Sequence, residues 1–497
     1  MPKALVGAAL LCAMPAYGAG YYQSAVGTRA YTRGGALIAG ADNLLAMYHN
    51  PAALIRLDRP QFMLDVAGVQ QWVEFNRTEV AGNGPLDDSG NPTDIAYQTV
   101  KNTAPAYAIP QIAVAHHFGT PNTTFAFGFY PPYAPDLAYD ASGAQRYSLI
   151  DTLIIQTVLG PSIAHQFTDW LSIGGGVSWN VLIAEQSLNI SVPFHSSDVL
   201  AALEDDWSPA PNEDPANDVA FLFRATDTGG FGGNLGVLIE PPAARWAVGA
   251  MAQFPVAFHA TGRMEADFSN HSLYTDGLID EQVVMAAITT DEEVKIEITM
   301  PLILKGGVLF RPSKDTEIEL AAVWQNWSSI RQQTITDVDM VIDLNEAFFG
   351  GDVLEDAVID EDVVLPASFT DSLSVRLGGH HMVSDKWTLR AGVLYESSAI
   401  PQETQSVGLI DGDKIGYGAG ATYQPNTRWA LDAGLFQSFL QKRTITDSIA
   451  RQIAVHPTNG SLLEGTVVGN GVFDSSIFLF GAGLNWFFGT DRKELSE

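Results

Sequence analysis

The sequence contains a single cysteine, Cys12, which lies near the N-terminus. It sits in a charge-free apolar stretch, ALVGAALLCAMPA, that follows Lys3 and runs into the small-residue tripeptide AYG. A basic residue, a short apolar core and small residues at a cleavage site are typical of a secretory signal peptide. We expect residues 1–18 to be removed on export, which leaves a mature chain without cysteine and therefore without disulfides.

Long apolar runs and basic residues are also scarce. After the N-terminal segment no apolar run reaches the roughly 18 residues that a membrane-spanning helix needs, so any membrane crossing would have to be made by strands. Lysine and arginine together number 26 against 57 acidic residues, and the net charge is -31. Because a phosphate backbone binds to clusters of basic side chains, this balance excludes a nucleic-acid-binding protein.

The rest of the chain contains recurring segments of alternating hydrophobicity. Each is long enough for the roughly 9 to 11 residues of a tilted membrane strand. We recognise about 14 of them by their period of two. They cover residues 61–75, 106–118, 122–131, 150–167, 170–191, 229–240, 244–262, 294–311, 315–340, 370–383, 387–400, 412–425, 428–445 and 473–488.

The connections between these segments alternate in length. Short turns such as GTP, TD and PPA alternate with long connections such as 76–105, 192–228 and 263–293. Short turns at one end, long loops at the other and an even strand number are features of outer-membrane barrels. We therefore predict an all-β fold, a transmembrane antiparallel β-barrel of about 14 strands over residues 61–488, followed by a periplasmic tail at 489–497.

The predicted strands divide their side chains between two faces. In WTLRAGVLYE (387–396), Trp387 and Tyr395 share one face with aliphatic residues, whereas Arg390 and Glu396 lie on the other. The first face suits lipid and the second suits a water-filled lumen. By the same alternation, Trp324 and Trp429 are expected to face lipid.

Charges of both signs are predicted to line the lumen. Arg376 and Arg390 lie on neighbouring strands and are positioned to pair with Glu317, Glu319 or Glu396. Such pairs would fill and rigidify the interior, and the alternative is that one of the charged groups contacts a substrate directly.

A segment near the start of the mature chain breaks the strand pattern. ADNLLAMYHNPAAL (41–54) has a helical pattern that must end at Pro51, because proline lacks an N–H and its ring clashes with the preceding turn. Asn50 is then able to hydrogen-bond backbone groups that are left without partners. A purely structural helix stop and a gating role both fit this motif.

The longer stretch GTRAYTRGGALIAGADNLLAMYHNPAAL resembles the plug region of the FadL/TodX-type outer-membrane channels for long-chain fatty acids and hydrocarbons. WQNWSSIR (324–331), LRAGVLYESSAIPQET (389–404) and GPSIAHQFTDWLSIGGGVSW (160–179) also resemble segments of that family. The order and spacing of these motifs carry the resemblance over nearly the whole mature chain. The plug residues that match are Gly27, Ala30, Tyr31, Ala41, Asp42, Asn43, Asn50, Pro51 and Ala52.

The resemblance implies a channel in the bacterial outer membrane, with residues 19–60 forming a small helical plug in the lumen. It also implies long-chain fatty acids or other lipophilic molecules as substrates, outer-membrane lipids and lipopolysaccharide as surroundings, and a monomeric barrel. At one position the sequence departs from the family, which usually has an aromatic residue where this chain has His49. The plug and gating residues that the resemblance implies are Tyr48, His49, Asn50, Pro51 and Ala52.

The third predicted strand runs into a group of prolines. In FAFGFYPPYAPD (125–136) the three prolines cannot donate ladder hydrogen bonds, so we expect strand pairing to fail there. The failure marks either the start of a loop or an opening in the wall. The resemblance implies an opening, a kinked strand beside a lateral window that releases substrate into the membrane. The exit residues that it implies are Phe129, Tyr130, Pro131, Pro132, Tyr133 and Pro135.

We find no catalytic, metal-binding or cofactor motif, since GxSxG and HExxH are missing and the strand glycines in GGG and GAG are interpreted as sites of curvature. The pairs His116-His117 and His380-His381 are not expected to hold a metal, because adjacent side chains of a strand point to opposite faces. The acidic loops EDDW, TTDEEV and LEDAVIDEDVV are expected to be solvated, with binding of Ca²⁺ or bridging to lipopolysaccharide as the alternative.

Three classes of function remain open at this point. The favoured one is a passive, substrate-selective channel for hydrophobic molecules. The others are a barrel enzyme that acts on lipids and a structural or adhesive barrel. For the channel, the helical-looking loops 196–207 and 279–290 are expected to cap the extracellular mouth and to offer the first docking site for substrate.

Overall fold

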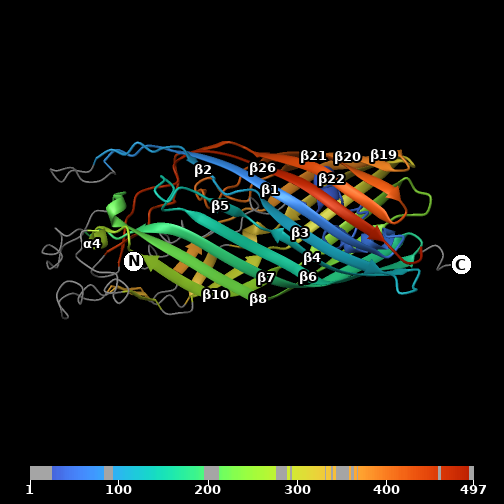
Figure 1. Ribbon diagram of the computed structural model, residues 1–497, viewed down its shortest axis with the longest axis horizontal. Coiled ribbons are helices and arrows are strands. Elements are labelled where there is room, and N and C mark those ends of the chain that lie inside the picture. The colour runs from blue at the N-terminus through green and yellow to red at the C-terminus, as the bar shows by residue number, and fades with distance from the viewer. Residues whose placement is uncertain are drawn as a thin grey trace.

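The computed structural model describes residues 25–82, 93–194, 212–275, 288–290, 294–330, 332–336, 340–342, 357–359, 363–366, 368–456 and 461–491. Within them, 14 antiparallel strands form a closed barrel whose strands are tilted against its long axis (Figure 1). In ring order these strands are β1 (Gln61–Arg77), β3 (Tyr107–His116), β4 (Thr123–Tyr133), β6 (Asp151–Thr168), β7 (Leu171–Ser191), β8 (Asp218–Ile239), β9 (Trp246–Gln253), β13 (Ile303–Ser313), β14 (Thr316–Gln325), β19 (Ser372–Ser384), β20 (Trp387–Glu396), β21 (Lys414–Asn426), β22 (Trp429–Leu440) and β26 (Gly471–Phe487).

The first and last strands close the ring. β1 pairs with β26 along its whole length, from Gln61 opposite Phe487 to Arg77 opposite Gly471. On its other side β1 pairs with β3, so no edge of the ring strand β1 is left free over residues 61–69. The predicted all-β antiparallel barrel of about 14 strands is therefore confirmed.

Several ring strands continue toward the end with the long connections. β9 continues as β10 (Val256–Asp267), β12 (Val294–Met300) leads into β13, β14 continues as β15 (Gln332–Thr336), and β18 (Val363–Pro366) leads into β19. Shorter strands are β2 (Val100–Lys101), β5 (Asp136–Ala138), β23 (Arg443–Ile445), β24 (Ala454–Val455) and β25 (Leu462–Leu463). A separate small sheet consists of β11 (Ile288–Thr290), β16 (Met340–Ile342) and β17 (Ala357–Ile359).

Helices are few and short. They are α2 (Thr28–Thr32), α3 (Ala46–His49), α4 (Ser272–Thr275) and the 3₁₀ helices η3 (Pro51–Arg56), η6 (Pro215–Asn217) and η7 (Trp327–Ser329). In the part of the chain that the structure describes, none of them has the length and apolar character of a transmembrane helix.

Two groups of predicted strand boundaries need correction. β8 begins at Asp218 and not at residue 229, although its odd-numbered residues from Val219 to Ala225 are buried in alternation. Its first half was missed because it carries Arg224, whose exposed side chain lies near two carboxylates of neighbouring strands and does not suit a lipid-facing band. The predicted spans 244–262 and 294–311 are each divided in two at positions where a proline lacks an N–H, and the span 315–340 contains β14, β15 and the start of β16.

The division of side chains between lipid and lumen agrees with the prediction. Trp387 and Tyr395 are each 45% exposed and Trp429 is 38% exposed on the outside of the ring, while Trp324 is half-buried. Arg390 and Glu396, which alternate with the exposed residues of β20, are buried on the inside. The wall therefore presents an apolar outer surface and a polar inner one.

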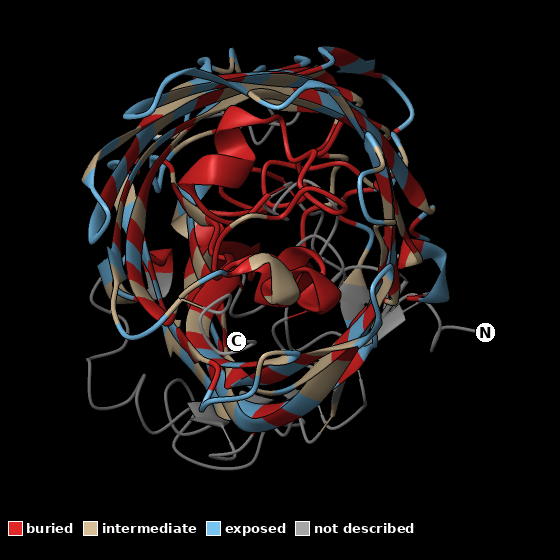
Figure 2. Ribbon diagram, turned by 90° about the vertical axis from the view of Figure 1, so that its right-hand side faces the viewer, coloured by how far each residue is buried: buried red, intermediate tan, exposed pale blue. Residues whose placement is uncertain are grey.

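Residues 25–57 lie inside the ring, where the end-on view shows buried helices and loops that cross the lumen (Figure 2). α2 contacts β20, β21, β22 and β26, on one side of the ring. η3 contacts β4, β6, β7 and β8, on the other side. We call residues 25–60 the inner segment; it is in contact with both halves of the wall.

Some sequence-based predictions fall on residues that the structure does not describe. These are the cleavable segment 1–18, the loop 196–207, the acidic loop EDDW, most of LEDAVIDEDVV and the last residues of the tail, 492–497. Of the predicted helical loop 279–290, only Ile288–Thr290 are described, and they form strand β11 and not a helix. β26 ends at Phe487, one residue before the predicted end of the barrel.

Candidate functional site

The turn at residues 50–52 lies against glycines of the barrel wall. A Cβ added to Gly174 on β7 would lie 2.5 Å from the backbone nitrogen of Ala52, and one added to Gly236 on β8 would overlap the side chain of Asn50. Gly249 on β9 is in the same situation, since its Cβ would lie 2.9 Å from Asn50 Nδ2. These glycines provide clearance for the inner segment, and one of them, Gly174, is the first glycine of the GGG that was interpreted as a site of curvature.

Asn50 connects this turn to the wall and to the rest of the inner segment. Its Oδ1 accepts a hydrogen bond from the backbone N–H of Ala52 (3.2 Å), which caps η3. Its Nδ2 donates to the carbonyl oxygens of Ile38 (3.2 Å) and Val237 (3.1 Å). A side chain that is fully buried therefore satisfies three backbone groups.

Glu319 on β14 holds a second turn of the inner segment. Its Oε1 accepts hydrogen bonds from the backbone N–H groups of Ile38 (2.7 Å) and Ala39 (2.8 Å), and its Oε2 accepts one from Gly40 (2.9 Å). Arg33 Nη2 lies 3.3 Å from the same Oε2, and both charged side chains are fully buried. One wall carboxylate thus has four partners in the inner segment.

A second group of charges joins α2 to the strands β20 and β22. Arg29 Nε lies 2.9 Å from Asp432 Oδ2, and Arg29 Nη1 lies 3.4 Å from Asp42 Oδ1. Asp42 is also 3.5 Å from Arg390 Nη2. Burial alone would raise the pKa of Asp42, but the two guanidinium groups hold this pKa below its ordinary value.

The charged residues that the sequence placed in the lumen have these partners. Arg376 lies 3.5 Å from Glu396, one of the pairings that the alternation suggested. Arg390 pairs with aspartates and not with a glutamate, because one of these aspartates belongs to the inner segment, whose position no strand pattern specifies. Glu317 pairs with Arg311 (2.8 Å).

Tyr48 and His49 lie at the end of α3, beside a buried cation. Lys305 Nζ on β13 donates a hydrogen bond to the Tyr48 carbonyl oxygen (3.0 Å) and lies 3.6 Å from the centre of the Tyr48 ring. His49 Nε2 is 2.8 Å from the carbonyl oxygen of Val26, and burial lowers the pKa of His49 to about 3. Sequence reasoning missed Lys305, and the alternation of β13, which buries it, was the available signal.

The proline-rich end of β4 is irregular. Residues 130–134 are all buried, so the alternation of exposed and buried side chains that a wall strand shows is lost there. Pairing with β3 ends at Phe129, and pairing with β6 shifts register between Tyr130 and Tyr133. Strand pairing on the β3 side fails where it was expected to fail, although β4 itself continues to Tyr133.

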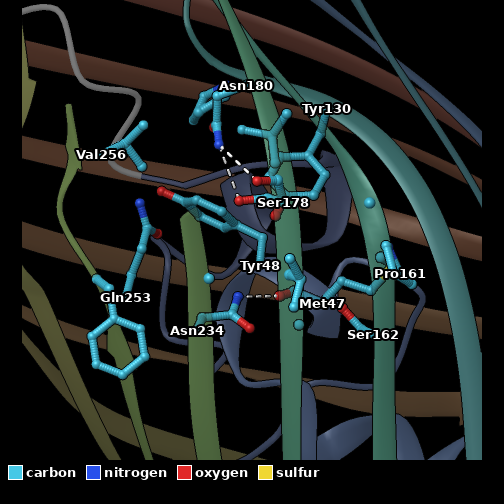
Figure 3. A pocket seen from close by; sticks show the side chains of 17 residues that line it. Met47, Tyr48, Tyr130, Pro161, Ser162, Ser178, Asn180, Asn234, Gln253 and Val256 are labelled. Carbon is cyan, nitrogen blue, oxygen red and sulfur yellow. Dashed lines mark hydrogen bonds between the residues drawn. The ribbon is translucent and has the colours of Figure 1, made fainter. Parts of the chain in front are cut away.

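A small cavity lies between this end of β4 and the junction of β9 with β10 (Figure 3). Tyr48 and Met47 of the inner segment project into it, and Asn234 donates a hydrogen bond to the Met47 carbonyl oxygen (2.8 Å). Its volume of about 30 Å³ is that of roughly one water molecule. The other lining residues are Tyr130, Pro132, Val158, Gly160, Pro161, Ser162, Gly176, Val177, Ser178, Asn180, Gly233, Gln253, Phe254 and Val256.

The two histidine pairs do not converge on a common point. His380 Nδ1 lies 3.8 Å from Glu317, whereas His381 Nδ1 lies 2.8 Å from Thr316 Oγ1. His117 is buried and close to Thr124 Oγ1 (3.4 Å), whereas the ring of His116 packs against Phe118. Adjacent histidines therefore have separate surroundings, as the strand geometry predicted.

Comparison with known families identifies this arrangement. The model of the family described as "Outer membrane protein transport protein (OMPP1/FadL/TodX)" matches residues 10–476. The chain belongs to this family. The match covers the inner segment and all but the last part of the barrel, so the family resemblance that the motifs suggested is confirmed, and with it a place in the bacterial outer membrane.

Individual relatives of the family are distant in sequence. The chain is 23% identical over 456 residues to the long-chain fatty acid transport protein of Escherichia coli K12, which covers 87% of this chain and 90% of the relative. It is 24% identical over 455 residues to outer membrane protein P1 of Haemophilus influenzae, which covers 86% and 88%.

Solved structures of the family share the fold. A FadL homologue of Pseudomonas aeruginosa has a TM-score of 0.71 at 17% identity, covering 95% of this chain and all of that one. The toluene transporter TodX of P. putida has a TM-score of 0.60 at 16% identity, covering 94% and 99%. At these identities the likeness concerns the barrel architecture.

Proposed function

We propose that this chain is a passive outer-membrane channel whose substrates are long-chain fatty acids. The observation that carries this proposal is Lys305, a buried lumenal lysine that has no ion-pair partner among the described residues. Its contacts are the carbonyl oxygen and the ring of Tyr48, whose side chain lines the cavity. A fatty acid supplies the missing carboxylate, and an aromatic hydrocarbon does not.

The relatives support the same substrate class. The curated proteins of Escherichia coli and Salmonella that match over most of their length are named for long-chain fatty acid transport, whereas three of the similar solved structures are named for toluene. Proteins similar to this chain are thus named for both substrate classes. The buried cation favours the anionic one.

The inner segment acts as a plug that gates the lumen. A cavity of about 30 Å³ is far smaller than the roughly 300 to 1,000 Å³ of sites that enclose a ligand. A fatty acid enters only after residues 47–52 move, and the contacts of Asn50 and Glu319 set the free energy of that movement. The plug therefore spends most of its time docked.

The irregular end of β4 is a lateral exit. Its pairing with β3 is already absent above Phe129, so an acyl chain can leave there without breaking a continuous ladder. Entering lipid stabilises the chain by about 0.8 kcal/mol for each buried CH₂, which provides a driving force without an energy source. The ring is closed between its first and last strands, so β1 offers no free edge to a second copy over residues 61–69, and the barrel works as a monomer, surrounded by outer-membrane lipid and lipopolysaccharide.

The test removes the amino group of Lys305 and keeps a side chain of similar length. Lys305→Met is expected to weaken binding of a labelled long-chain fatty acid by about tenfold or more, since a hydrogen bond to a charged group contributes about 1.5–3 kcal/mol. Uptake of a neutral alkane of similar length should be unchanged. Lys442→Met is the control, because Lys442 is exposed and lies 3.5 Å from Asp474.

The outcomes separate the substrate class from the channel itself. Equal loss of acid and alkane transport would reject the carboxylate anchor and leave Lys305 with a structural role. A wild-type protein that takes up neither compound when reconstituted in membranes would reject the channel.

A further inference from the structure

The wall is interrupted between β8 and the β9–β10 strand. The C-terminal part of β8 pairs with β9, and this ladder ends at Asn234, which lies opposite Gln253. The N-terminal part of β8 pairs with β10, and that ladder ends at Thr226, which lies opposite Thr261. Between these two ladders, residues 227–233 and 254–260 are all described and form no ladder pair with each other, although β8 stays paired with β7 and β10 with β12 on their other sides. We call this interruption the β8–β10 slit; at about 3.3 Å per residue it is roughly 20 Å long.

Single hydrogen bonds fix the two ends of the slit. At one end Phe254 donates its backbone N–H to the Gly233 carbonyl oxygen (2.9 Å). At the other end His259 donates its backbone N–H to Asp227 Oδ2 (2.6 Å). The register is the same on both sides, so the two strands are aligned as neighbours and the ladder is missing only in between.

Glycines form one rim of the slit. The β8 stretch DTGGFGG (227–233) contains four of them, and none has a positive φ, so backbone conformation does not require glycine here. A Cβ added to Gly230 would lie 2.6 Å from the ring of Phe258, and one added to Gly232 would lie 2.6 Å from Val256 Cγ2. The glycines are needed for clearance, and the space they leave is filled by these two side chains.

Phe258 and Val256 are therefore the only described side chains of the opposite rim that pack into the glycine positions. Both are buried, Phe258 to 1% exposure. Side chains change rotamer far more readily than a continuous ladder breaks, because no backbone hydrogen bond has to be lost. At this one level the wall can open by the movement of two apolar side chains.

The slit has lipid on its outer side. Phe231 and Phe254 on its two rims are 71% and 43% exposed, and Val177 on the adjacent strand is 64% exposed. The charged cluster around Arg224 begins only a few residues further along β8, so the slit lies at the extracellular border of the apolar band. It faces the outer leaflet of the membrane.

The slit has the cavity on its inner side. Gly233, Phe254 and Val256 are lining residues of the cavity, and so is Tyr48 of the plug. Figure 3 shows Val256 and Gln253 on one side of this space, with Tyr48 and Asn234 facing them. The same cavity reaches Tyr130 and Pro132, so it has a wall defect at each of two separate positions in the ring.

We propose that the β8–β10 slit is a second lateral opening, through which the apolar chain of a substrate passes between the cavity and the outer leaflet. This inference rests on the proposed function, since it assigns a further route to the same cavity. Phe258 and Val256 form the gate, and the glycines of β8 give them room to close. The slit is separate from the exit at β4, from which β6 and β7 divide it.

A reversible cross-link across the slit tests this route. The mature chain is expected to have no cysteine, so the double variant Gly232→Cys, Val256→Cys carries one possible disulfide. The Cβ of residue 232 lies 2.6 Å from Val256 Cγ2, and Val256 Cβ is at most one bond further, within reach of the roughly 3.5–4.5 Å that a disulfide requires. We expect oxidation to lower the initial uptake rate of a labelled long-chain fatty acid at least twofold, and reduction to restore it.

A matched control cross-links the same pair of strands where the ladder is continuous. Ile239 and Val248 lie directly opposite each other in β8 and β9, and a disulfide between Ile239→Cys and Val248→Cys should leave uptake unchanged. Equal uptake by the oxidised and reduced forms of the slit variant would overturn the second opening. Lack of uptake by the reduced variant and by wild type alike would instead count against the proposed function.

A second variant keeps the test independent of disulfide formation. Phe258→Ala removes the larger gate residue and should raise the uptake rate at least twofold. Phe436→Ala is its control, because Phe436 is also an inward phenylalanine over a glycine, Gly416, but lies in an unbroken ladder. If the two variants change uptake equally, Phe258 is not a gate and the slit is closed wall.

Discussion

Replacing Glu319 by glutamine should release one side of the plug. In the folded protein this carboxylate accepts three backbone N–H bonds from residues 38–40 and pairs with Arg33. Glutamine offers a single neutral acceptor, so some of these N–H groups and the guanidinium of Arg33 lose their partner in a buried site. Removing one member of a buried ion pair costs about 3–5 kcal/mol, which would shift the docking equilibrium of this turn by a factor on the order of 1,000.

Amide hydrogen exchange measures this shift directly. The N–H groups of residues 38–40 should exchange about 1,000-fold faster in Glu319→Gln than in wild type, within the limit set by global stability. Glu317→Gln is the matched control, since Glu317 lies two residues earlier on the same strand, is less buried and pairs with Arg311 of the wall. Unchanged protection in Glu319→Gln, or the same loss in both variants, would refute the anchoring role.

Three further outcomes are expected. Replacing Pro131 by Val and Pro132 by Thr should extend the β4 ladder and lower fatty-acid uptake about fivefold or more with unchanged equilibrium binding, and uptake at the original rate would exclude exit at β4. Asn50→Ala should leave the carbonyl groups of Ile38 and Val237 without a donor and lower the unfolding free energy of the plug by about 2–4 kcal/mol, measured by hydrogen exchange of residues 50–54. Burial lowers the pKa of His49 to about 3, so the docked plug holds a neutral imidazole. Its stability should be full well above pH 6.5 and should fall by about 2 kcal/mol between pH 6.5 and 4.5, a slope that His49→Gln removes.

The sequence was sufficient to predict the wall, and the reason is local. A period of two, interrupted by turns, reports directly on which side chains face lipid, as in β20, where each predicted outward residue is exposed. The first half of β8 was missed because it stands beyond the lipid band, where Arg224 is exposed and the lipid-facing signal is absent. Charged side chains obscured a stretch whose buried residues nevertheless alternate from Val219 to Ala225.

The contacts between plug and wall could not be predicted in the same way. Glu319 and Arg33 are 286 positions apart in the chain, and nothing in either local pattern specifies the other. Alternation placed Glu319 in the lumen but gave no partner, and Arg390 was assigned to glutamates because the position of Asp42 depends on the folded plug. The strand glycines were recognised, but their role follows from the backbone that packs against them.

The pairing of the first strand with the last has a consequence for assembly. Gln61 lies opposite Phe487, so the ring cannot be completed until nearly the whole chain has crossed into the membrane. Strand pairs of such high sequence separation form late, because the entropy of closing so long a loop must be overcome first. Thr28 of the plug binds Asp65 of the first strand, and its side chain also packs close to Gly481 of the last. The inner segment is therefore expected to lie beside an open sheet until β26 pairs with β1, and this pairing encloses it as the last step of assembly.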